Sequence, residues 1–495
     1  MILGKLCMET MRLESITRIV QPIQVRGPLH FDIEGIAYDS RQVKPNYLFV
    51  ALRGQREDGA AYIEDALRRG AVALVSEEDR WPRRNIAHIL VEDARRAMAE
   101  ISCAFYDHPS QKIPVVGVTG TNGKTTTAFM VREILAAEGR HPGLVGTVRY
   151  EIGTRVIPAS RTTPEAPDIQ FMLDQMLRSG CRSAVMEVSS HGLAQRRVWG
   201  TDFDVGVFTN LTRDHLDFHG SMEAYFDAKM QLFRSLGQQH KRAAAVVNID
   251  DEWGMQLVKT NGLRAHLLTY GEHPGADVRA EDIELDAHGT RFTVRTPWGG
   301  TDAHLRLLGR FNVSNALAAI ATAGTLGVAP ARSAAILAGM NTVPGRLERV
   351  PADRGFSVFV DYAHTDDALA NVLDTLRELK PRRLITVFGC GGNRDRSKRP
   401  LMGAVAHQRA DYTILTSDNP RRERPEAILA EIEQGIPTPD RHEVVVDREE
   451  AIARAIAMAR DGDIVLIAGK GHENVQEFSS TVVPFDDREV ARRYL

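Results

Sequence analysis

The sequence predicts an α/β protein of three domains, in which the central sheet is mostly parallel. With 495 residues the chain is too long for one hydrophobic core, and at roughly 100–200 residues per domain it makes about three. Short apolar runs alternate with amphipathic segments, which is typical of strand–helix units. The pattern places a small α/β domain at residues 1–110, the central domain at 111–341 and a third α/β domain at 342–495.

The composition is that of an ordinary soluble protein, with 43% hydrophobic and 26% charged residues and a net charge of −3. That charge gives no reason to expect nucleic acid or an anionic membrane as a partner. No stretch approaches the roughly 18 apolar residues of a membrane helix, and the amino-terminal apolar run is too short for a signal peptide. Cys7, Cys103, Cys181 and Cys390 lie too far apart for a disulfide framework or a zinc site. We therefore expect reduced, buried thiols, which suit a cytoplasmic protein. A monomer is expected as well, although no feature of the sequence specifies the oligomeric state.

The first domain shows strands and helices but no catalytic constellation. Strands are expected at 36–41, 48–52 and 71–75, a helix at 62–69 and a linker at 107–110. Gly70 stops the helix, because glycine favours the position just after a helix end.

The central domain begins with a loop that has the chemistry of a phosphate cradle. An apolar strand at 113–118 leads into glycines at 117, 120 and 123, and an amphipathic helix follows at 129–137. Glycines let the backbone approach phosphates, Lys124 adds a positive charge, and the Thr125 hydroxyl suits a phosphate-bound Mg²⁺. The strict P-loop spacing is not met, because the chain has Val118 where the motif requires its first glycine. The alternative is a plain glycine turn with a threonine that caps the helix. The strand, the Gly-Lys-Thr-Thr run and the polar residues downstream favour a nucleotide site.

Two further polar groups follow strands of the same sheet. Glu187 lies near the end of a strand at 183–188, and His215 comes after the next strand, at 204–208. Ligands collect at the carboxyl ends of parallel strands, so both side chains are expected at the edge that carries Lys124, following adjacent strands. A carboxylate and an imidazole there could hold a divalent cation, directly or through water. Solvated loop groups are the alternative.

Lys229 lies on the apolar face of a helix at 222–233, three or four residues from Tyr225, Phe226 and Phe233. The pattern leaves two interpretations open. Either the side chain snorkels past the rings to water, or it has altered chemistry, with a depressed pKa or an amine converted to a metal-binding carbamate.

Two asparagines open an alanine-rich helix. Asn312 and Asn315 are three residues apart and share a face, so both could meet the edge of a ring. Capping of the helix by Asn312 explains its position equally well.

The third domain repeats the pattern of strands that end in glycines and charged residues. Strands are expected at 357–360, 384–388, 412–415 and 464–468. Their polar ends should share the carboxyl edge of a sheet. The glycines at 389–392 weakly suggest a dinucleotide site, but no acidic residue follows at the required offset.

Taken together, these segments resemble the Mur ligase family in order and spacing. The matching segments are 119–127, 187–191, 214–215, Lys229, 312–315, 344–346, 361–364 and 469–473. The resemblance spans nearly the whole chain after about the first dozen residues. The phosphate loop alone would also admit folylpolyglutamate synthases, but the 189–197 and 418–421 segments narrow the choice.

The resemblance implies an architecture and a reaction. It implies an N-terminal domain that holds the UDP end of a substrate, a central P-loop ATPase and a C-terminal Rossmann-like domain that brings an amino acid. The implied ligands are ATP, Mg²⁺, a UDP-N-acetylmuramoyl dipeptide and diaminopimelate, in peptidoglycan precursor synthesis. ATP would phosphorylate the D-glutamate carboxylate and the incoming amine would attack the acyl phosphate, which suits a carboxylate that is otherwise unreactive toward amines. The alternatives are a lysine-adding member, a folylpolyglutamate ligase, and a regulatory protein that binds nucleotide without chemistry.

By the same resemblance, five overlapping groups of residues make the site. The catalytic residues are Lys124, Glu187, His215 and Lys229, and the metal ligands are Thr125, Glu187, His215 and Lys229, with Lys229 carbamylated. The ATP contacts are Gly120, Thr121, Asn122, Gly123, Lys124, Thr125, Thr126, Asn315, Arg346 and Asp361. The UDP-muramoyl dipeptide contacts are Ser40, Thr162, Thr163, Ser189, Gln195 and Arg197. The diaminopimelate contacts are Arg394, Asp418, Asn419, Arg421, Gly469 and Glu473.

The far end of diaminopimelate suggests how it is selected. Arg421 can hold the far carboxylate bidentately, and Glu473 can accept a hydrogen bond from the far ammonium. Lysine lacks that carboxylate and would leave a buried arginine unpaired, which penalises lysine strongly. Surface pairing of Arg421 with Glu423 is the alternative.

Two positions depart from the family pattern. Asp366 stands where the family has proline, and because Asp is acceptable in a first helical turn, only the helix start should differ. Arg161 precedes the two threonines where smaller residues are common. The pattern leaves the role of Arg161 open.

Overall fold

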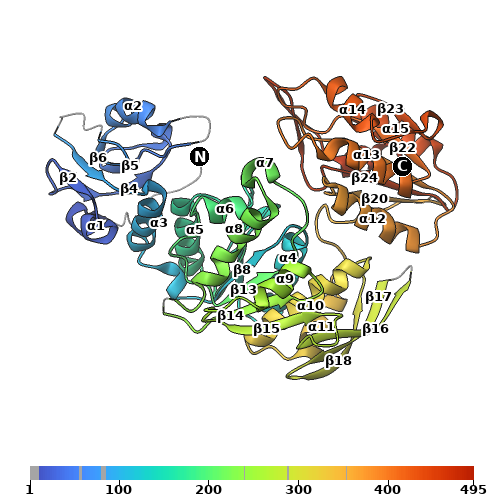
Figure 1. The fold of residues 1–495 in the computed structure, drawn as a ribbon, viewed down its shortest axis with the longest axis horizontal. Helices are drawn as coiled ribbons and strands as arrows, with labels where there is room; N and C mark the ends of the chain where they lie inside the picture. Colours follow the sequence, from blue (N-terminus) through green and yellow to red (C-terminus); the bar gives the residue numbers. More distant parts are fainter. Residues whose placement is uncertain (1–9, 55–57, 80–84, 239, 287–288, 353) are drawn as a thin grey trace. The chain divides into compact units, whose positions relative to one another are not determined.

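The computed structural model describes residues 10–54, 58–79, 85–238, 240–286, 289–352 and 354–495. It confirms an α/β fold with three main, mostly parallel sheets (Figure 1). By compactness the chain divides into two units. The first unit comprises Met1–Gly117, Arg140–Asp204 and Gln231–Ala243. The second unit comprises Val118–Gly139, Val205–Met230 and Ala244–Leu495. These units are discontinuous in sequence, so the three domain boundaries stay a prediction.

The first sheet has the strand order β2-β7-β6-β5-β4 and is parallel except for β2. Its strands are β2 (Gln24–Arg26), β4 (Gly35–Ala37), β5 (Tyr47–Val50), β6 (Ala71–Ser76) and β7 (Ala87–Leu90), and a separate small pair joins β1 (Met11–Arg12) to β3 (Asp32–Ile33). Helices α1 (Leu13–Val20) and α3 (Ala94–Phe105) pack on one face, and α2 (Ile63–Arg68) packs on the other. The strand predicted at 36–41 ends earlier, because Asp39 caps a short 3₁₀ turn, Ser40–Gln42.

The largest sheet has the strand order β11-β10-β9-β12-β8-β13-β14-β15-β16-β17-β18. Its strands are β8 (Val115–Thr119), β9 (Pro142–Val145), β10 (Arg149–Ile152), β11 (Arg155–Pro158), β12 (Ser183–Glu187), β13 (Val205–Phe208), β14 (Ala244–Asn248), β15 (His266–Gly271), β16 (Val278–Asp286), β17 (Gly289–Thr296) and β18 (Gly299–Leu305). Strand β8 lies between β12 and β13, so the prediction that Glu187 and His215 follow adjacent strands is wrong. The antiparallel strands β16 to β18 escaped prediction, although alternating polar and apolar residues in β17 carry the signal.

The helices of this region follow the predicted strand–helix alternation. They are α4 (Lys124–Ala137), α5 (Ala166–Arg178), α6 (Ser190–Ala194), α7 (Leu216–His219), α8 (Met222–Ser235), α9 (Glu252–Val258), α10 (Arg310–Thr325) and α11 (Pro330–Ala338). The alanine-rich α10 packs along α4, the helix that begins at the phosphate loop.

The third sheet has the order β19-β20-β24-β21-β22-β23, with all strands but β19 parallel. Its strands are β19 (Glu348–Val350), β20 (Ser357–Asp361), β21 (Leu384–Phe388), β22 (Tyr412–Leu415), β23 (His442–Val444) and β24 (Ile464–Ala468), and a hairpin of β25 (Val475–Glu477) and β26 (Val482–Pro484) follows. Helices α12 (Asp366–Glu378), α13 (Lys398–Arg409) and α14 (Pro425–Glu433) cover one face, while α15 (Arg448–Met458) and α16 (Asp487–Tyr494) cover the other. Helices on both faces of a parallel sheet confirm the predicted Rossmann-like layering. Helix α12 starts at Asp366 behind a capping Thr365, so the helix begins at the position where the family has proline.

Three of the four cysteines lie in the described part of the chain. Cys103, Cys181 and Cys390 are buried and free, and burial raises the pKa of Cys103 and of Cys390 to about 12. Cys7 lies outside the described residues. Across the residues that the structure describes, every helix is too short or too polar to cross a membrane.

Candidate active site

The phosphate loop is a tight turn between β8 and α4. Gly120 and Gly123 have φ angles of 147° and 84°, in the left-handed region that favours glycine. A Cβ on Gly120 would lie 1.8 Å from Oγ1 of Thr209, and a Cβ on Gly123 would lie 2.4 Å from Oδ1 of Asn315. The loop therefore admits only glycine at both positions, as a cradle must when phosphates approach its N–H groups.

Two lysines converge on one carbonyl of this loop. The Lys124 ammonium donates to the carbonyl oxygens of Gly120 and Thr121 at 3.0 and 2.7 Å. The Lys229 ammonium donates to the same Gly120 oxygen at 2.7 Å and lies 4.5 Å from the ring centroid of Tyr225. Lys229 is 1% exposed, and burial together with the charge of Lys124 holds the pKa of Lys229 well below its ordinary value. The snorkelling interpretation is therefore wrong, because the amine faces the loop rather than water.

The segment after β13 fixes the other side of the loop. The Thr121 hydroxyl lies 3.1 Å from the Tyr225 hydroxyl and donates to the carbonyl of Thr212 at 3.2 Å. The N–H of Asn122 donates to Oδ1 of Asn210 at 2.9 Å. These contacts with residues 210 and 212 stabilise the conformation of the loop, although the phosphate-loop motif does not include those residues.

Threonines at the start of α4 are buried. Thr125 and Thr126 are 2% and 6% exposed, and Oγ1 of Thr125 accepts a hydrogen bond from Nη2 of Arg346 at 2.9 Å. The guanidinium of Arg346 stacks 4.8 Å from the ring centroid of Tyr362. The carboxylate of Asp361 accepts from the backbone N–H of Leu347, one residue after Arg346, at 2.5 Å. Three predicted ATP contacts, Thr125, Arg346 and Asp361, are thus linked.

Asn315 lies beside the loop and does not cap its helix. Its Nδ2 donates to Oδ1 of Asn312 at 3.0 Å, and its Oδ1 accepts from the hydroxyl of Thr127 at 3.3 Å. Asn312 donates to the carbonyl of Leu308 at 2.8 Å, while Gly309 occupies the N-cap position of α10. The interpretation of Asn312 as an N-cap is therefore wrong, and the asparagine pair serves to orient Asn315 toward α4.

His215 sits in the turn before α7, with Nδ1 3.3 Å from Oδ1 of Asp214. Among the described residues no group of three or more His, Cys, Asp or Glu side chains is arranged around a metal position. Mg²⁺ prefers oxygen ligands and usually keeps waters and substrate phosphates beside one or two carboxylates. The hydroxyl of Thr125 and the carboxylate of Glu187 are each an oxygen ligand of the kind that such a phosphate-bound ion takes.

Glu187 is buried at the end of β12 within a group of hydroxyls. Its Oε1 accepts from the N–H of Thr147 at 2.8 Å and its Oε2 accepts from the Thr147 hydroxyl at 2.9 Å. The Thr162 hydroxyl lies 3.1 Å from that of Thr147. The Thr163 hydroxyl donates to the Glu187 carbonyl at 2.9 Å and accepts from the N–H of Ser189 at 2.9 Å. The structure thus joins three predicted dipeptide contacts, Thr162, Thr163 and Ser189, to a predicted metal ligand.

Arg197 extends this group. Its Nη2 donates to Oε1 of Gln195 at 2.6 Å and its Nη1 donates to the carbonyl of Thr163 at 2.8 Å. Its Nε lies 3.0 Å from Oε1 of Glu165, which also accepts from Nη1 of Arg161 at 2.7 Å. The role that the sequence left open for Arg161 is therefore an ion pair with Glu165 beside Arg197.

Ser40 is the predicted dipeptide contact that no described hydrogen bond joins to this group. It is 4% exposed, and its hydrogen bond to Asp65 lowers the pKa of that carboxyl. Two residues earlier, the hydroxyl of Tyr38 donates to Oδ2 of Asp168 on α5 at 2.7 Å. Burial and the nearby Asp168 raise the pKa of Tyr38. The first domain therefore meets α5 through Tyr38, which no sequence motif marked.

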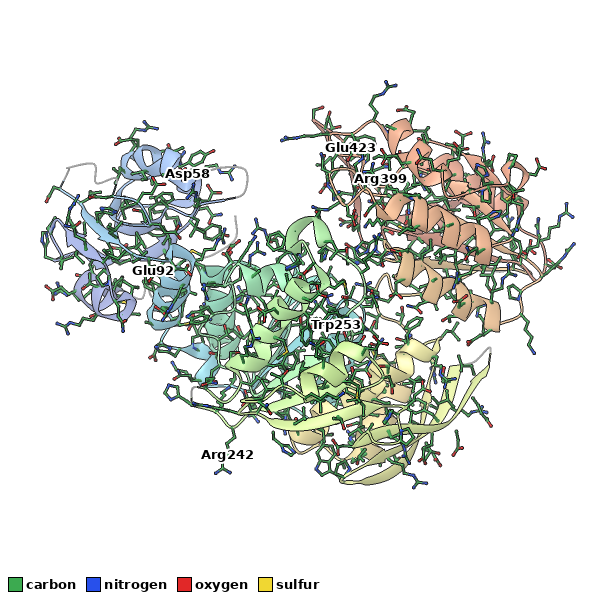
Figure 2. All side chains as sticks on the ribbon, in the orientation of Figure 1. Asp58, Glu92, Arg242, Trp253, Arg399 and Glu423 are labelled. Carbon is green, nitrogen blue, oxygen red and sulfur yellow. The ribbon has the colours of Figure 1, made fainter. Side chains whose placement is uncertain are left out.

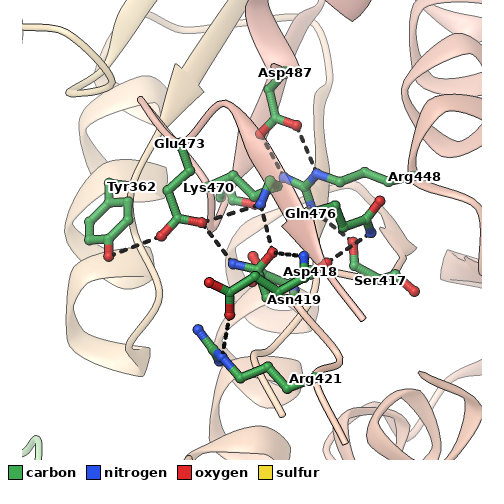
Figure 3. A network of polar contacts seen from close by, with 12 residues as sticks. Tyr362, Ser417, Asp418, Asn419, Arg421, Arg448, Lys470, Glu473, Gln476 and Asp487 are labelled. Carbon is green, nitrogen blue, oxygen red and sulfur yellow. Dashed lines mark hydrogen bonds and ion pairs between the residues drawn. The ribbon is translucent and has the colours of Figure 1, made fainter. Parts of the chain in front are cut away.

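A buried lysine forms the centre of a polar network in the C-terminal domain (Figure 3). The Lys470 ammonium, whose side chain is 0% exposed, donates to Oδ1 of Asn419 at 3.0 Å and lies 3.2 Å from Oε2 of Glu473. Nδ2 of Asn419 donates to the same Glu473 oxygen at 2.8 Å. Burial and the neighbouring Asp418 raise the pKa of Glu473. Three predicted amino-acid contacts, Asp418, Asn419 and Glu473, thus share one network with Lys470.

A buried ion pair lies in the same network (Figure 3). Nε and Nη2 of Arg448 donate to the two carboxylate oxygens of Asp487 at 2.8 and 2.7 Å, and both side chains are 0% exposed. The same guanidinium donates to the carbonyls of Ser417 at 3.3 Å and Ala468 at 2.9 Å. Arg448 therefore connects the chain just after β22 to the end of β24, the two segments that carry the predicted amino-acid contacts.

Arg421 does not pair with Glu423, so that alternative is wrong. Its Nε donates to Oε2 of Glu477 at 2.8 Å and its Nη1 donates to the carbonyl of Gly392 at 3.0 Å. Glu423 instead accepts from Nη1 of the fully buried Arg399 at 2.9 Å. Figure 2 labels both residues in the C-terminal domain.

The remaining predicted amino-acid contacts lie around two glycines. A Cβ on Gly391 would lie 2.9 Å from Nη1 of Arg421 and 3.7 Å from Cγ of the exposed Arg394, so both arginines border this glycine. Gly469 has a φ of 109°, and a Cβ there would lie 2.7 Å from Oδ2 of Asp418. The network leaves space for glycine alone at position 469.

The glycines at 389–392 serve close backbone packing. A Cβ on Gly389 would lie 1.9 Å from the carbonyl oxygen of Thr416, and one on Gly392 would lie 1.9 Å from that of Pro420. They let the ends of β21 and β22 approach each other, which explains the cluster without a dinucleotide.

Several residues of these networks escaped sequence reasoning, namely Thr147, Glu165, Tyr362, Arg448, Lys470 and Glu477. Lys470 had a signal, since it stands between the predicted contacts Gly469 and Glu473. Tyr362 had one too, since it lies inside the matched segment 361–364. Glu165 pairs with Arg161 only four residues away, a spacing that sequence alone could have suggested. Thr147, Arg448 and Glu477 bind partners far away in the chain and carry no local pattern.

Family models match the chain in three segments. The Mur ligase family catalytic domain matches residues 32–106, the Mur ligase middle domain residues 118–323 and the Mur ligase glutamate ligase domain residues 345–471. The UDP-N-acetylmuramoyl-L-alanyl-D-glutamate--2,6-diaminopimelate ligase of Geobacter metallireducens is 47% identical and covers 97% of each chain. The protein of the same name from Clostridioides difficile is 45% identical over 98% of this chain and 99% of its own.

Solved structures agree. A structure of a UDP-N-acetylmuramoyl-L-alanyl-D-glutamate--2,6-diaminopimelate ligase aligns with a TM-score of 0.69 at 35% identity over 98% of each chain. MurF from Acinetobacter baumannii aligns with a TM-score of 0.68 at 19% identity, a likeness of fold alone. Domain matches along the chain and relatives that are 45–47% identical over nearly its full length establish that it belongs to the Mur ligase family.

Proposed function

We propose that this chain is an ATP-dependent, amide-bond-forming ligase that adds diaminopimelate to UDP-N-acetylmuramoyl-L-alanyl-D-glutamate and so makes a peptidoglycan precursor. Relatives named for this reaction are 44–47% identical over 93–98% of the chain. The observation that carries the substrate assignment is the C-terminal polar site. Arg421 and Arg394 border Gly391 there and suit a carboxylate, while Glu473 suits an ammonium.

The phosphate loop suits the first half of the reaction. The γ-phosphoryl group of ATP passes to the side-chain carboxylate of the D-glutamate unit, forming an acyl phosphate and releasing ADP. Such a transfer needs positioning and charge neutralisation more than covalent chemistry. The N–H groups at the start of α4 and the ammonium of Lys124 supply both. Mg²⁺ held by the phosphates, Thr125 and Glu187 would neutralise further negative charge.

Lys229 supports the carbamate hypothesis. Its buried amine has a lowered pKa, and the neutral amine is the form that reacts with CO₂. Conversion to a carbamate would replace the ammonium of Lys229 with a negatively charged group whose oxygens could bind a metal near the loop. An intact mass heavier by one CO₂, lost in Lys229→Arg, is the expected result. Full activity of the unmodified protein in CO₂-free buffer would contradict it.

The C-terminal site suits the second half. The amine of the amino acid attacks the acyl carbonyl, the new C–N bond forms as the C–O bond to phosphate breaks, and the amine gives up a proton. Arg421 and Arg394 would hold the carboxylate at the far end, and Glu473 with Asp418 would hold the ammonium there. The threonine and serine residues around Glu187, together with Gln195 and Arg197, would hold the dipeptide.

A panel of amino acids tests the assignment. The purified chain is given ATP, Mg²⁺, UDP-N-acetylmuramoyl-L-alanyl-D-glutamate and one amino acid at a time, and ADP and product mass are measured. We expect turnover with diaminopimelate and at least about a hundredfold lower kcat/KM with lysine, because lysine leaves the arginines unpaired. Equal turnover of both would remove the specificity claim, and no ADP release with any amino acid would favour the non-enzymatic alternative. Arg421→Lys should lower the preference, whereas Arg454→Lys, on an exposed ion pair of the same domain, should not.

A further inference from the structure

Strand β25 is bonded to the turn that carries Arg421. Nε2 of Gln476 donates to the carbonyl of Asp418 at 2.8 Å, and the N–H of Glu477 donates to Oδ1 of Asn419 at 3.0 Å. The N–H of Arg421 donates to the carbonyl of Glu477 at 3.0 Å. Glu477 is therefore held beside the proposed amino-acid site by hydrogen bonds at both its N–H and its carbonyl.

The side chains of Glu477 and Arg421 repeat this pairing. Oε2 of Glu477 accepts from Nε of Arg421 at 2.8 Å, and the carbonyl of Gly392 accepts from Nη1 at 3.0 Å. Arg421 itself has a φ of 52°, a left-handed conformation that a non-glycine residue adopts only where its surroundings hold it. Backbone and side chain are thus both set by contacts around the turn.

These contacts use two of the five N–H donors of the guanidinium. Nε carries a single N–H, and that donor is already given to Glu477. A carboxylate can pair with a guanidinium at the side, through Nε and one terminal nitrogen, or at the end, through both terminal nitrogens. With Nε given to Glu477 and one N–H of Nη1 given to Gly392, one donor on Nη1 and two on Nη2 remain for a ligand.

We propose that Glu477 is a positioning residue that occupies the side edge of Arg421, so that the far carboxylate of the amino acid binds end-on to Nη1 and Nη2. The inference rests on the proposed function. Glu477 also gives Arg421 a partner that keeps the guanidinium from turning to other carboxylates of the domain. It acts on the substrate only through Arg421.

The test is a comparison of steady-state kinetics for Glu477→Gln and Glu477→Ala in the full chain. Gln keeps an oxygen that accepts from Nε, whereas Ala leaves Nε without a partner. We expect KM for diaminopimelate to rise about tenfold in Glu477→Ala and about two- to threefold in Glu477→Gln, from the strength of hydrogen bonds to charged groups. The kcat and the KM for ATP should stay within about twofold. Glu443→Ala, which removes an exposed partner of Arg454 in the same domain, is the matched control and should change none of these values.

A second measurement asks whether Glu477 works through Arg421. In an Arg421→Ala background, Glu477→Ala should produce no further rise in KM, because the guanidinium that it positions is gone. An additional rise there, or an unchanged KM for diaminopimelate in Glu477→Ala alone, would overturn the inference. So would equal losses in kcat and in both KM values, which indicate a structural role. A wild-type chain without diaminopimelate turnover would instead refute the proposed function, and the two failures are distinguishable.

Discussion

The phosphate loop and the proposed amino-acid site both follow the carboxyl ends of parallel strands, but they are assembled differently. The loop is one continuous stretch whose shape depends on Gly120 and Gly123. The ammonium groups of Lys124 and Lys229 donate hydrogen bonds to its backbone carbonyls. The amino-acid site takes residues from strand ends that are far apart in the chain and rests on the buried pair of Arg448 and Asp487. A continuous motif depends on backbone geometry, and an assembled site depends on charge networks that hold its pieces together.

The largest expected effect separates the two regions by function. Lys124→Ala should lower kcat/KM for ATP-dependent turnover by about 10³-fold, because one cation at the transferring phosphoryl group is lost. Diaminopimelate binding, measured by calorimetry without ATP, should be unchanged. Lys112→Ala removes a surface partner of Asp107 and is the control. A loss of diaminopimelate binding in Lys124→Ala would show that the two regions are not independent.

The next effect concerns the buried ion pair. Arg448→Met should destabilise the C-terminal domain by about 3–5 kcal/mol, because Asp487 is left charged and buried. The double variant Arg448→Met with Asp487→Leu should recover most of that loss. Hydrogen exchange of β22 and β24 is the suitable measurement, since all four tryptophans lie before residue 342. Arg454→Met should cost less than about 0.5 kcal/mol, and an equal cost for both would contradict the comparison.

A smaller effect tests the geometry of the loop. Gly123→Ala and Gly139→Ala both place a side chain at a left-handed φ, 84° and 70°, which costs about 1–2 kcal/mol. Only at Gly123 would the Cβ meet a neighbour, Asn315, whereas nothing lies within 4 Å at Gly139. We expect KM for ATP to rise about tenfold in Gly123→Ala alone, if displacing Asn315 costs about 1.4 kcal/mol. Similar KM values in the two variants would show that close packing at Gly123 is unimportant.

The smallest effect is a pH dependence. Hydrogen bonds from Arg399 lower the pKa of Glu423, and hydrogen bonds from Arg396 and Arg399 lower that of Glu431. Groups with a depressed folded-state pKa stabilise the fold above their ordinary value of 4.5, and that contribution is lost as the pH falls through the depressed pKa. The melting temperature should therefore fall on acidification below pH 4.5, and less steeply in Glu423→Gln. Identical acid slopes would show that Glu423 is not responsible.

Continuous motifs were predictable from the sequence, whereas contacts between distant segments were not. The strands at 384–388, 412–415 and 464–468 and the glycine loop were found because periodicity and local motifs mark them. The apolar face around Lys229 predicted an unusual lysine, but two outcomes were open because only three-dimensional packing decides where the amine points. Arg421 was assigned a near neighbour, Glu423, as its alternative partner, whereas the observed partner, Glu477, lies 56 residues away. Spacing in the sequence suggests ion pairs between near neighbours, whereas only the folded structure shows which distant residues pair.

The buried thiols have a practical consequence. With a pKa of about 12, Cys103 and Cys390 hold almost no thiolate at neutral pH, and the thiolate is the form that maleimides and peroxides attack. Once Cys7 and Cys181 are replaced, two cysteines engineered onto exposed helices would be labelled ahead of these two thiols. A pair of fluorophores at those positions would then test whether the outer domains move during turnover, without rebuilding the interior.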